Sequence, residues 1–380
     1  MHRPCILGFP DHHQLDARIS VVVPTYKEVL NLSPLIGRLE LVKGRFAEFE
    51  VIVVDDNSAD GTIELIETLR KDWVKLLVRE NERGLSTAVI KGLNAAKNEI
   101  LVVMDADLSH PPETIFQMVK QLIHCEADFV IGSRYTEGGK IQEGWGLFRW
   151  LNSFVSTTLA RPFTSAKDPM SGFFCIRAEK FRQAKSLNPI GYKIGLELIV
   201  KCGCRNIQEV PIFFSDRHLG QSKIAGKVAH LREVRNYLKH IKRLADFKYG
   251  LFSYAAQFGF IGAIGTLVNI IVLSVLLKFY LDERLSIILA ILAGMNSNFI
   301  LNRIITFSSS QSGRGFVQQY FSFLISCSIG ACVNFAVTFW ILNKAPIAHE
   351  IPALAVLGGV ISGMAFNFFL SRYWVFRDKK

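Results

Sequence analysis

Four long apolar runs constrain this chain of 380 residues more than any other feature of its sequence. They cover residues 252–277, 285–305, 320–342 and 351–369. Each run is close to the ~20 residues that an α-helix needs to cross the hydrocarbon core of a bilayer. We therefore predict that residues 250–380 form an all-α domain of four transmembrane helices.

Charges beside these runs predict the orientation of the chain in the membrane. Residues 303–314 and 372–380 carry net charges of +2 and +3, whereas residues 278–284 and 343–350 each sum to zero. Positively charged loops stay preferentially on the cytoplasmic side. Residues 1–17, an N-terminal extension, contain no sustained apolar core of the kind found in secretory signals. We expect an integral protein of the cell membrane, or an equivalent membrane, with a cytoplasmic catalytic domain.

The net charge of +11 arises entirely after residue 221. Residues 1–221 hold 27 basic and 27 acidic side chains, whereas residues 222–249 hold 8 and 2. This distribution favours contact with a lipid bilayer and no nucleic acid. Apolar residues recur in the basic segment at helical spacing: Ile224, Val228, Leu231, Val234, Leu238, Ile241 and Leu244. We expect one or two basic amphipathic helices at the membrane interface; the alternative is a helix that packs on the soluble domain.

Residues 18–221 alternate short apolar runs with helical patterns. The runs fall within residues 19–28, 50–62, 74–78, 99–107 and 127–135, and the helical patterns cover residues 30–41, 62–69, 86–96 and 112–123. This alternation indicates an α/β domain with a mostly parallel, Rossmann-like sheet covered on both faces. Ligands bind beyond the carboxyl ends of such strands. The first turn, PTYKE, lacks the glycine motifs of dinucleotide-binding enzymes and P-loop hydrolases.

Two aspartates, Asp105 and Asp107, follow the fourth run in EILVVMDADLSHPPE. Strand alternation would point both side chains to one side of the chain. Two carboxylates beside a diphosphate make the oxygen-rich site that Mg²⁺ or Mn²⁺ favours, and such an ion stabilises the charge on a departing diphosphate. The alternative is that Asp107 caps the following turn and Asp105 ends the strand in solvent. Because Asp55 and Asp56 end the second run, we favour the metal site.

Several motifs occur together and in order: PTYKE, DDNSADGT, RGLS, DADLSHPPE, GSRY, DPMSGFF and FSDRHLGQSKI. Over residues 18–230 the chain resembles glycosyltransferase family 2, and within it the polyprenyl-phosphate hexosyltransferases of the dolichyl-phosphate mannose synthase type. The resemblance implies a GT-A fold for residues 18–221. It also implies inverting transfer of a hexose from a nucleotide sugar to the phosphate of a membrane-embedded polyprenol.

The same resemblance implies roles for residues at the strand ends. The residues that would border the nucleotide are Pro24, Tyr26, Glu28, Asp55 and Asp105. The metal would be held by Asp105, Asp107 and Ser109, where Ser109 stands in the place of a Gln in some relatives. The catalytic set would be Asp107, Asp168 and Arg217, with Asp168 orienting sugar and acceptor.

Arginine offers planar paired donors that suit the phosphate of the acceptor. The residues that match phosphate-binding positions are Arg134, Arg149, Ser153, Arg217 and Lys223. For Arg149 the alternative is an ordinary exposed side chain on an amphipathic helix. We expect Lys193 and Glu197 near the same pocket, or else as a surface pair one helical turn apart.

The apolar half contains a repeat. NFILNR at residues 298–303 recurs as NFFLSR at 367–372, and IGTLVN at 264–269 recurs as IGACVN at 329–334, with offsets of 69 and 65. A duplicated two-helix hairpin is predicted, which resembles the GtrA-like membrane domain. Five asparagines lie within the spans: Asn269, Asn296, Asn298, Asn334 and Asn367. They either mark a lipid or sugar path or form hydrogen bonds between helices.

The sequence thus predicts a membrane-bound transferase, dependent on Mg²⁺ or Mn²⁺, that moves mannose from GDP-mannose to polyprenyl or dolichyl phosphate. Two alternatives stay open. One is the same reaction with UDP-glucose or UDP-N-acetylhexosamine, and the other is a lipid-linked sugar flippase with a degenerate transferase domain. The QxxRW motif of processive polysaccharide synthases is absent.

Overall fold

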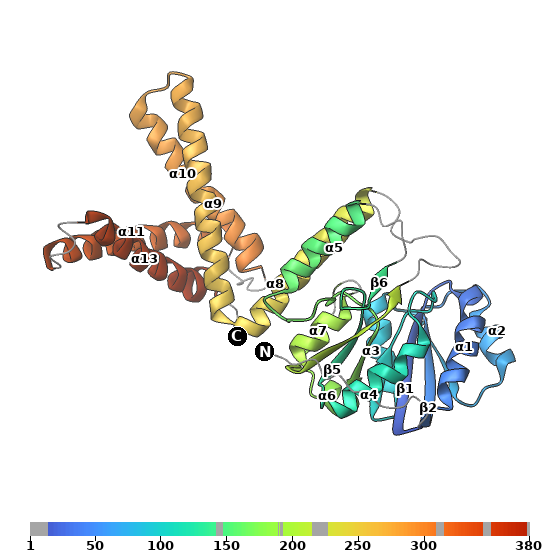
Figure 1. Ribbon diagram of the computed structural model, residues 1–380. Coiled ribbons are helices and arrows are strands. Elements are labelled where there is room, and N and C mark those ends of the chain that lie inside the picture. The colour runs from blue at the N-terminus through green and yellow to red at the C-terminus, as the bar shows by residue number, and fades with distance from the viewer. Residues whose placement is uncertain are drawn as a thin grey trace. The chain divides into compact units, whose positions relative to one another are not determined.

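The structure is a computed structural model. It describes residues 14–141, 147–188, 190, 193–214, 227–308, 315–344 and 351–377. The chain divides into two compact units, Met1–Lys248 and Tyr249–Lys380 (Figure 1).

The first unit is an α/β domain. Its strands are β1 (Leu15–Thr25), β2 (Phe46–Asp55), β3 (Val74–Val78), β4 (Ile100–Val103), β5 (Phe129–Ser133), β6 (Lys140–Ile141), β7 (Phe174–Arg177), β8 (Ile207–Pro211) and β9 (Phe213–Phe214). Its helices are α1 (Val29–Lys43), α2 (Thr62–Leu69), α3 (Leu85–Ala95), the 3₁₀ helix η1 (Pro112–Thr114), α4 (Ile115–His124), α5 (Leu147–Ala160), α6 (Ala178–Arg182), α7 (Ile194–Lys201) and α8 (Lys227–Tyr249).

The main sheet has the strand order β3-β2-β1-β4-β7-β5-β8 among the described residues. Its strands are parallel except β7, which runs antiparallel to both β4 and β5. The predicted runs are β1 to β5 and the predicted helical patterns match α1 to α4, so the mostly parallel α/β domain is confirmed. Three details differ: β7 and β8 of the main sheet were not predicted, and β1 begins at Leu15, within the expected N-terminal extension.

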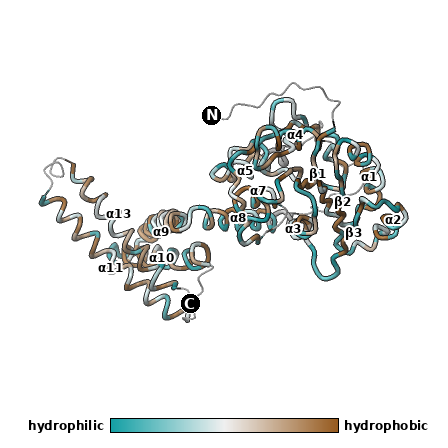
Figure 2. Tube along the Cα trace, turned by 90° about the horizontal axis from the view of Figure 1, so that it is seen from below, coloured by the Kyte–Doolittle hydropathy of each residue, from teal (hydrophilic) through white to brown (hydrophobic). Residues whose placement is uncertain are grey.

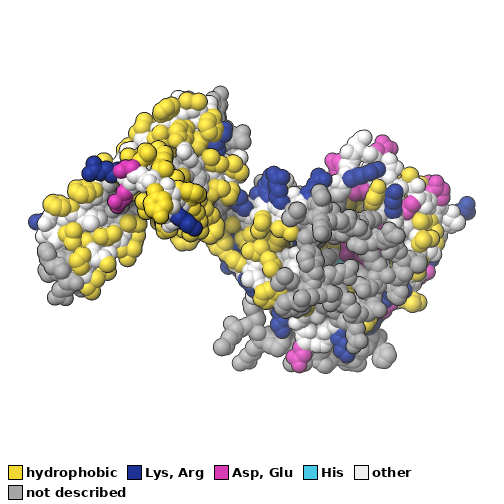
Figure 3. Space-filling view, turned by 90° about the horizontal axis from the view of Figure 1, so that it is seen from above, with side chains coloured by type: hydrophobic (Ala, Val, Ile, Leu, Met, Phe, Trp, Pro, Cys, Tyr) yellow, Lys and Arg dark blue, Asp and Glu magenta, His cyan; other side chains and the backbone are white. Residues whose placement is uncertain are grey.

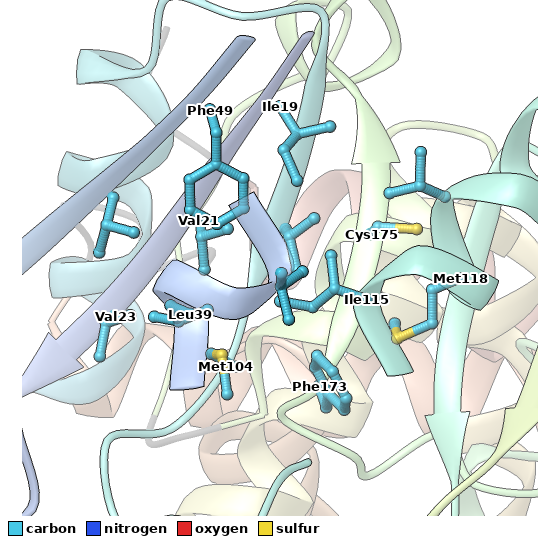
Figure 4. Close-up of a cluster of buried hydrophobic side chains, with 14 of the residues drawn as sticks. Ile19, Val21, Val23, Leu39, Phe49, Met104, Ile115, Met118, Phe173 and Cys175 are labelled. Carbon is cyan, nitrogen blue, oxygen red and sulfur yellow. The ribbon is translucent and has the colours of Figure 1, made fainter. Parts of the chain in front are cut away.

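Both faces of the sheet are buried under helices. On one face, Val21 and Val23 of β1 pack with Leu39 of α1 and Met118 of α4 (Figure 4). On the other face, Val22 of β1 packs with side chains of α3 and α7. Successive side chains of a strand point to opposite faces, which is why the central parts of these strands, such as residues 21–23 of β1 and 51–54 of β2, are continuously apolar (Figure 2). Each fully buried aliphatic side chain contributes ~1.5–3 kcal/mol.

Helix α8 packs beside α5 within the first unit (Figure 1). The Tyr237 hydroxyl donates to the carbonyl of Ser156 at 2.6 Å, and Leu244 is buried against Phe163. The predicted apolar stripe is therefore split. Leu244 packs inward, whereas Val234 and Leu238 are exposed. The alternative prediction, a helix that packs on the soluble domain, accounts for the inward face of α8. Residues 222–226 of the predicted basic segment lie outside the described residues.

The second unit consists of helices. They are α9 (Leu251–Lys278), α10 (Glu283–Leu301), the π-helical segment η2 (Asn302–Thr306), α11 (Phe316–Lys344), α13 (Pro352–Leu370) and the π-helical segment η3 (Ser371–Val375). Four helices in the described residues are long and apolar enough to cross a membrane, as predicted. Hydrophobic side chains gather over this unit, whereas charged side chains are scattered over the first (Figure 3).

The sequence repeat is also a structural repeat. Helix α9 packs on α10, and α11 packs on α13. A Cβ added at Gly265 would lie 2.1 Å from Asn298 Oδ1, and one added at Gly330 would lie 2.1 Å from Asn367 Oδ1. These pairs are related by the offsets of 65 and 69. In each hairpin, therefore, the asparagine side chain of one helix packs directly against a glycine of the other helix.

Aromatic rings join the two hairpins. Phe307 and Phe376, which are also 69 residues apart, stack with centroids 4.8 Å apart. The Tyr320 hydroxyl of α11 donates to Asn296 Oδ1 of α10 at 2.6 Å. This contact supports the interpretation of an intramembrane asparagine as an interhelical hydrogen-bond partner.

We predict that Gly265→Ala and Gly330→Ala will each destabilise the membrane unit by about 1–3 kcal/mol or more, because the added methyl group overlaps an asparagine amide. Gly262→Ala is the matched control, since it lies one turn away in α9 and no atom lies within 4 Å of its Cβ position. Thermal unfolding in detergent measures the difference. Equal midpoints for Gly262→Ala and Gly265→Ala would refute this packing.

Candidate active site

The candidate site lies at one edge of the main sheet. The carboxyl ends of β1, β2, β4 and β5 share this edge because these strands run in the same direction. β7 is antiparallel and inserted between β4 and β5, so it begins where they end. The loop before β7, with Asp168 and Gly172, therefore meets the segments that follow β4 and β5.

Asp55 ends β2 and is almost fully buried. Its carboxylate accepts hydrogen bonds from Thr25 Oγ1 at 3.0 Å, from Ser58 N at 2.8 Å and from Ser58 Oγ at 2.5 Å. Thr25 ends β1 and pairs with Asp55 in the register. Asp55 therefore ties the ends of β1 and β2 together.

The other residues predicted to border the nucleotide surround the end of β1. Pro24 is the second-to-last residue of β1, and the half-buried Tyr26 follows the end of that strand. Glu28 Oε2 accepts from Asn31 Nδ2 at 2.8 Å. Arg83 lies over the Tyr26 ring, with its guanidinium carbon 5.2 Å from the centroid. The structure thus brings the predicted nucleotide residues to one end of β1.

A buried ion pair that the motifs did not predict fixes the turn after β3. Arg79 is almost fully buried and donates from Nε to Asp56 Oδ1 at 2.7 Å. The other carboxylate oxygen of Asp56 accepts from Gly84 N at 2.8 Å. Gly84 has a φ of +140°, in the region that favours glycine. The only sequence signal for Arg79 is its position directly after the third apolar run.

Asp105 and Asp107 lie beyond β4, which ends at Val103. Strand alternation therefore does not set the directions of their side chains, contrary to the basis of the prediction. Asp107 is buried, and its Oδ1 accepts from Ser109 N at 3.2 Å and Ser109 Oγ at 2.6 Å, which is the turn-capping contact of the alternative. The side chain of Asp105 is 36% exposed.

His110 supports Asp105 and was missed by the sequence reasoning, although it stands within the same motif. Its Nδ1 accepts from Asp105 N at 3.1 Å, so a neutral ring carries its proton on Nε2. The ring is buried and stacks on Phe173 with centroids 5.2 Å apart. A Cβ at Gly172 would lie 3.3 Å and 3.4 Å from the Asp105 carboxylate oxygens. Glycine there leaves room beside that carboxylate.

Arg134 and Asp168 form a closed ion pair. Asp168 is fully buried; its Oδ2 accepts from Arg134 N at 3.0 Å and Nε at 2.8 Å, and its Oδ1 accepts from Nη2 at 2.8 Å. Glu209 of β8 accepts from Asp168 N at 2.9 Å. Burial alone would lower the pKa of Arg134, but hydrogen bonding and charge pairing with Asp168, with a contribution from Asp105, raise it. Arg134 is therefore a permanent cation near Asp105.

The remaining predicted acceptor residues are only partly described. The Ser153 hydroxyl lies 2.7 Å from the Tyr135 hydroxyl, which brings α5 beside the segment after β5. Arg149 belongs to α5, but its side chain lies outside the described residues, as do Arg217 and Lys223. Their assignment stays a prediction.

Lys193 and Glu197 do not pair with each other. The buried Glu197 accepts from Lys201 Nζ at 2.7 Å and from Asn188 N at 2.7 Å. Burial, together with the charge of Arg134, lowers the pKa of Lys193 to about 8. Lys193 therefore lies near the Arg134–Asp168 pair as expected, whereas Glu197 stabilises its own helix.

The oxygen-bearing side chains after β4 fit a divalent metal ion that is also coordinated by a substrate. Among the described residues, no three His, Cys, Asp or Glu side chains come together as an ion-binding group. Asp105, Asp107 and Ser109 offer hard oxygen atoms after the same strand, which suits Mg²⁺ or Mn²⁺. Such an ion would need further oxygen ligands, which a substrate phosphate would supply.

Known proteins resemble both halves of the chain. The model of glycosyl transferase family 2 matches residues 20–184, and that of the GtrA/DPMS transmembrane domain matches residues 257–376. A dolichol-phosphate mannosyltransferase from Pyrococcus furiosus is 36% identical over 362 residues, which cover 94% of this chain and 98% of that protein. One from Saccharomyces cerevisiae is 42% identical over 246 residues, 61% of this chain and 88% of that protein.

Among solved structures, glucosyl-3-phosphoglycerate synthase from Mycobacterium tuberculosis in complex with Mn²⁺, uridine diphosphate and phosphoglyceric acid aligns with a TM-score of 0.46. The identity is 18%, over 62% of this chain and 79% of that chain. This likeness is too distant to assign ligands.

We predict that Asp168→Asn will lower the free energy of unfolding by about 3–5 kcal/mol, because it leaves the guanidinium of Arg134 buried without its counter-charge. Chemical denaturation of the detergent-solubilised protein measures the loss. Asp72→Asn, at an exposed position, is the control and should change the stability by less than about 0.5 kcal/mol. An unchanged stability of Asp168→Asn would contradict the ion-pair assignment.

Proposed function

The chain belongs to the dolichol-phosphate mannosyltransferases of glycosyl transferase family 2, with a GtrA-type transmembrane domain, and on that premise we propose that it transfers mannose from GDP-mannose to polyprenyl phosphate. The transfer inverts the configuration at the sugar carbon. It depends on a divalent metal ion and takes place at the cytoplasmic face of the membrane.

One observation carries the proposal: two chemically distinct groups meet at the same sheet edge. Asp105 and Asp107 follow β4, whereas Arg134 follows β5 and pairs with Asp168 of the loop before β7. Burial lowers the pKa of Arg134, and its pairing with Asp168 raises that pKa. Asp105 is close enough to raise it further. A carboxylate side suited to a metal-bound diphosphate therefore adjoins a cationic side suited to a phosphate monoester.

On the donor side, Pro24, Tyr26, Glu28 and Asp55 border the nucleoside. Asp105, Asp107 and Ser109 would hold the metal beside the diphosphate. When bound, the ion supplies positive charge that stabilises the departing diphosphate. His110 and Gly172 keep Asp105 in place and leave space beside its carboxylate.

On the acceptor side, cationic residues bind the phosphate of the polyprenol. They are Arg134, Arg149, Arg217 and Lys223, with Ser153 as a hydrogen-bond donor. An anionic phosphate oxygen attacks the sugar carbon as the bond from that carbon to the diphosphate breaks on the opposite face, which inverts the configuration. No proton has to be removed, so catalysis rests on positioning and on stabilising the leaving group.

We propose for Asp168 a role other than direct orientation of the sugar and acceptor. Its carboxylate is fully buried and both oxygens accept from Arg134. We assign it as a positioning residue that orients the guanidinium toward the acceptor.

The charge distribution supports the placement in the membrane. Residues 303–314 and 372–380 carry the positive charge next to the spans, which favours a cytoplasmic side shared with the catalytic domain. Val234 and Leu238 of α8 are exposed beside the basic residues Arg235 and Lys239. Such a surface suits the headgroup layer of a bilayer.

Labelled donors test the function. Membranes that contain the protein are incubated with radiolabelled GDP-mannose or UDP-glucose and polyprenyl phosphate, and the lipid fraction is counted. We expect label in lipid from GDP-mannose only, and none after chelation of divalent ions. Label from UDP-glucose alone would contradict the assignment of GDP-mannose as the donor. Transfer that survives chelation would contradict the dependence on a divalent metal ion.

We predict that Asp107→Asn will lower this transfer by at least about 100-fold, because it removes a charge that holds the metal and the diphosphate. The substitution keeps the size of the side chain, so the unfolding midpoint should remain close to that of the wild type. Asp72→Asn, which is exposed, should retain full activity. Retention of more than a tenth of the activity by Asp107→Asn would place the metal elsewhere.

A further inference from the structure

Phe214 is an aromatic residue at the carboxyl end of the main sheet. It belongs to β9, which pairs in parallel with β6, where Ile141 is its partner in the register. The backbone just before it is also fixed, because Ile212 N donates to the carbonyl of Ser133 at 3.0 Å. The carbonyl of Ile212 accepts from Lys140 N at 3.0 Å. The half-buried ring of Phe214 is therefore held next to the end of β5.

The Phe214 ring contacts one residue on each side of the candidate site. The guanidinium carbon of Arg134 lies over the ring, 5.2 Å from its centroid. The His110 ring meets it at an interplanar angle of 62°, with centroids 5.8 Å apart. These separations are typical of cation–π and edge-to-face aromatic contacts. Phe214 therefore joins the cation of the acceptor side to the histidine that supports Asp105.

His110 connects Phe214 to the proposed metal side. Its Nδ1 accepts from Asp105 N at 3.1 Å, so the orientation of the imidazole determines whether this hydrogen bond forms. The opposite neighbour of the ring is Phe173, stacked on it at an interplanar angle of 19°. A Cβ added at Gly172 would lie 3.5 Å from His110 Cε1. The imidazole is thus enclosed, and Phe214 forms one wall of the space that it occupies.

Arg134 connects Phe214 to the acceptor side. Asp168 accepts from Nε and Nη2 of Arg134 at 2.8 Å each, and these bonds fix the edge of the guanidinium. Its face is covered by aromatic rings, since the Tyr135 centroid lies 5.3 Å and the Phe214 centroid 5.2 Å from the guanidinium carbon. Hydrogen bonds at the edge and stacking at the face together set the plane of a guanidinium.

We propose that Phe214 is a positioning residue that couples the two sides of the candidate site. Its ring holds the His110 imidazole against the backbone of Asp105, and it also holds the Arg134 guanidinium in one plane. One apolar contact thus sets the geometry of both a metal-binding carboxylate and a phosphate-binding cation. The inference rests on the proposed function for the identity of the two ligands, whereas the coupling of the side chains does not depend on it.

The neighbouring Phe213 supplies the matched control. It stands on the same strand, and its side chain is 57% exposed. Successive side chains of a strand point to opposite faces, so Phe213→Leu removes an aromatic ring from β9 without removing the contacts of Phe214. Phe214→Leu removes those contacts but keeps an apolar side chain at a half-buried position, and Phe214→Tyr keeps the aromatic ring.

Hydrogen–deuterium exchange tests the coupling without any ligand. In the full-length protein in detergent, Phe214→Leu should speed exchange in peptides that contain the Asp105 amide by at least about tenfold, because His110 no longer protects that amide. Exchange in β1 should not change. Phe213→Leu should leave both segments at wild-type rates. Wild-type exchange of the Asp105 amide in Phe214→Leu would overturn the proposal.

Ligand affinities distinguish coupling from a purely structural role. Phe214→Leu should weaken the binding of Mn²⁺ in the presence of GDP by about tenfold and raise the KM for polyprenyl phosphate by about tenfold, since it disturbs both sides at once. Phe214→Tyr and Phe213→Leu should each keep both values within about threefold of the wild type. A change on one side only, or equal losses in Phe214→Leu and Phe214→Tyr, would overturn the coupling.

Two results separate this inference from the proposed function. If the wild-type protein does not transfer mannose, but Phe214→Leu still speeds exchange of the Asp105 amide, the proposed function fails and the coupling stands. If the wild-type protein transfers mannose, but Phe214→Leu keeps the wild-type exchange, Mn²⁺ affinity and acceptor KM, this inference fails alone.

Discussion

The active-site edge of this protein depends on how the charges of its buried aspartates are compensated. Removing a carboxylate from water costs several kcal/mol unless hydrogen bonds or a counter-charge replace the water. Asp55 is held by Thr25 and Ser58, Asp56 by Arg79, and Asp168 by Arg134. Asp105, by contrast, keeps a side chain that is 36% exposed. The partly exposed carboxylate of Asp105 therefore lies between buried aspartates that hydrogen bonds and ion pairs hold in place.

The antiparallel strand β7 brings the two sides of the site together. A parallel strand between β4 and β5 would begin at the opposite edge, and the loop with Asp168 and Gly172 would lie far from Asp105. Because β7 runs the other way, Gly172 approaches the Asp105 carboxylate and Asp168 reaches Arg134. The proposed donor and acceptor sides share one edge for this reason.

Much of this architecture could be predicted from local pattern. Continuous Val and Ile runs identify β1 to β5, and four apolar runs of spanning length identify α9, α10, α11 and α13. The membrane repeat was visible because Asn298 and Asn367 occupy equivalent places in one short motif, and the glycines against which they pack, Gly265 and Gly330, occupy equivalent places in another.

What could not be predicted depends on contacts between distant residues. Arg79 and Asp56 are 23 residues apart, and no motif marks their pairing. β7 has only four residues, too few for a clear period. In α8, the polar residues Tyr237 and His240 turn inward while Leu238 faces outward, so the apolar spacing alone could not identify the residues of α8 that contact the rest of the domain. The end of β4 at Val103 likewise depends on its neighbours in the sheet.

The central claim is that carboxylates after β4 hold a divalent ion together with a nucleotide diphosphate. Binding of Mn²⁺, followed by electron paramagnetic resonance with and without GDP, tests it most directly. The account predicts that GDP tightens the binding of Mn²⁺ to the wild-type protein and that this tightening disappears in Asp107→Asn. Mn²⁺ binding that is indifferent to GDP, or that survives this substitution unchanged, would contradict it.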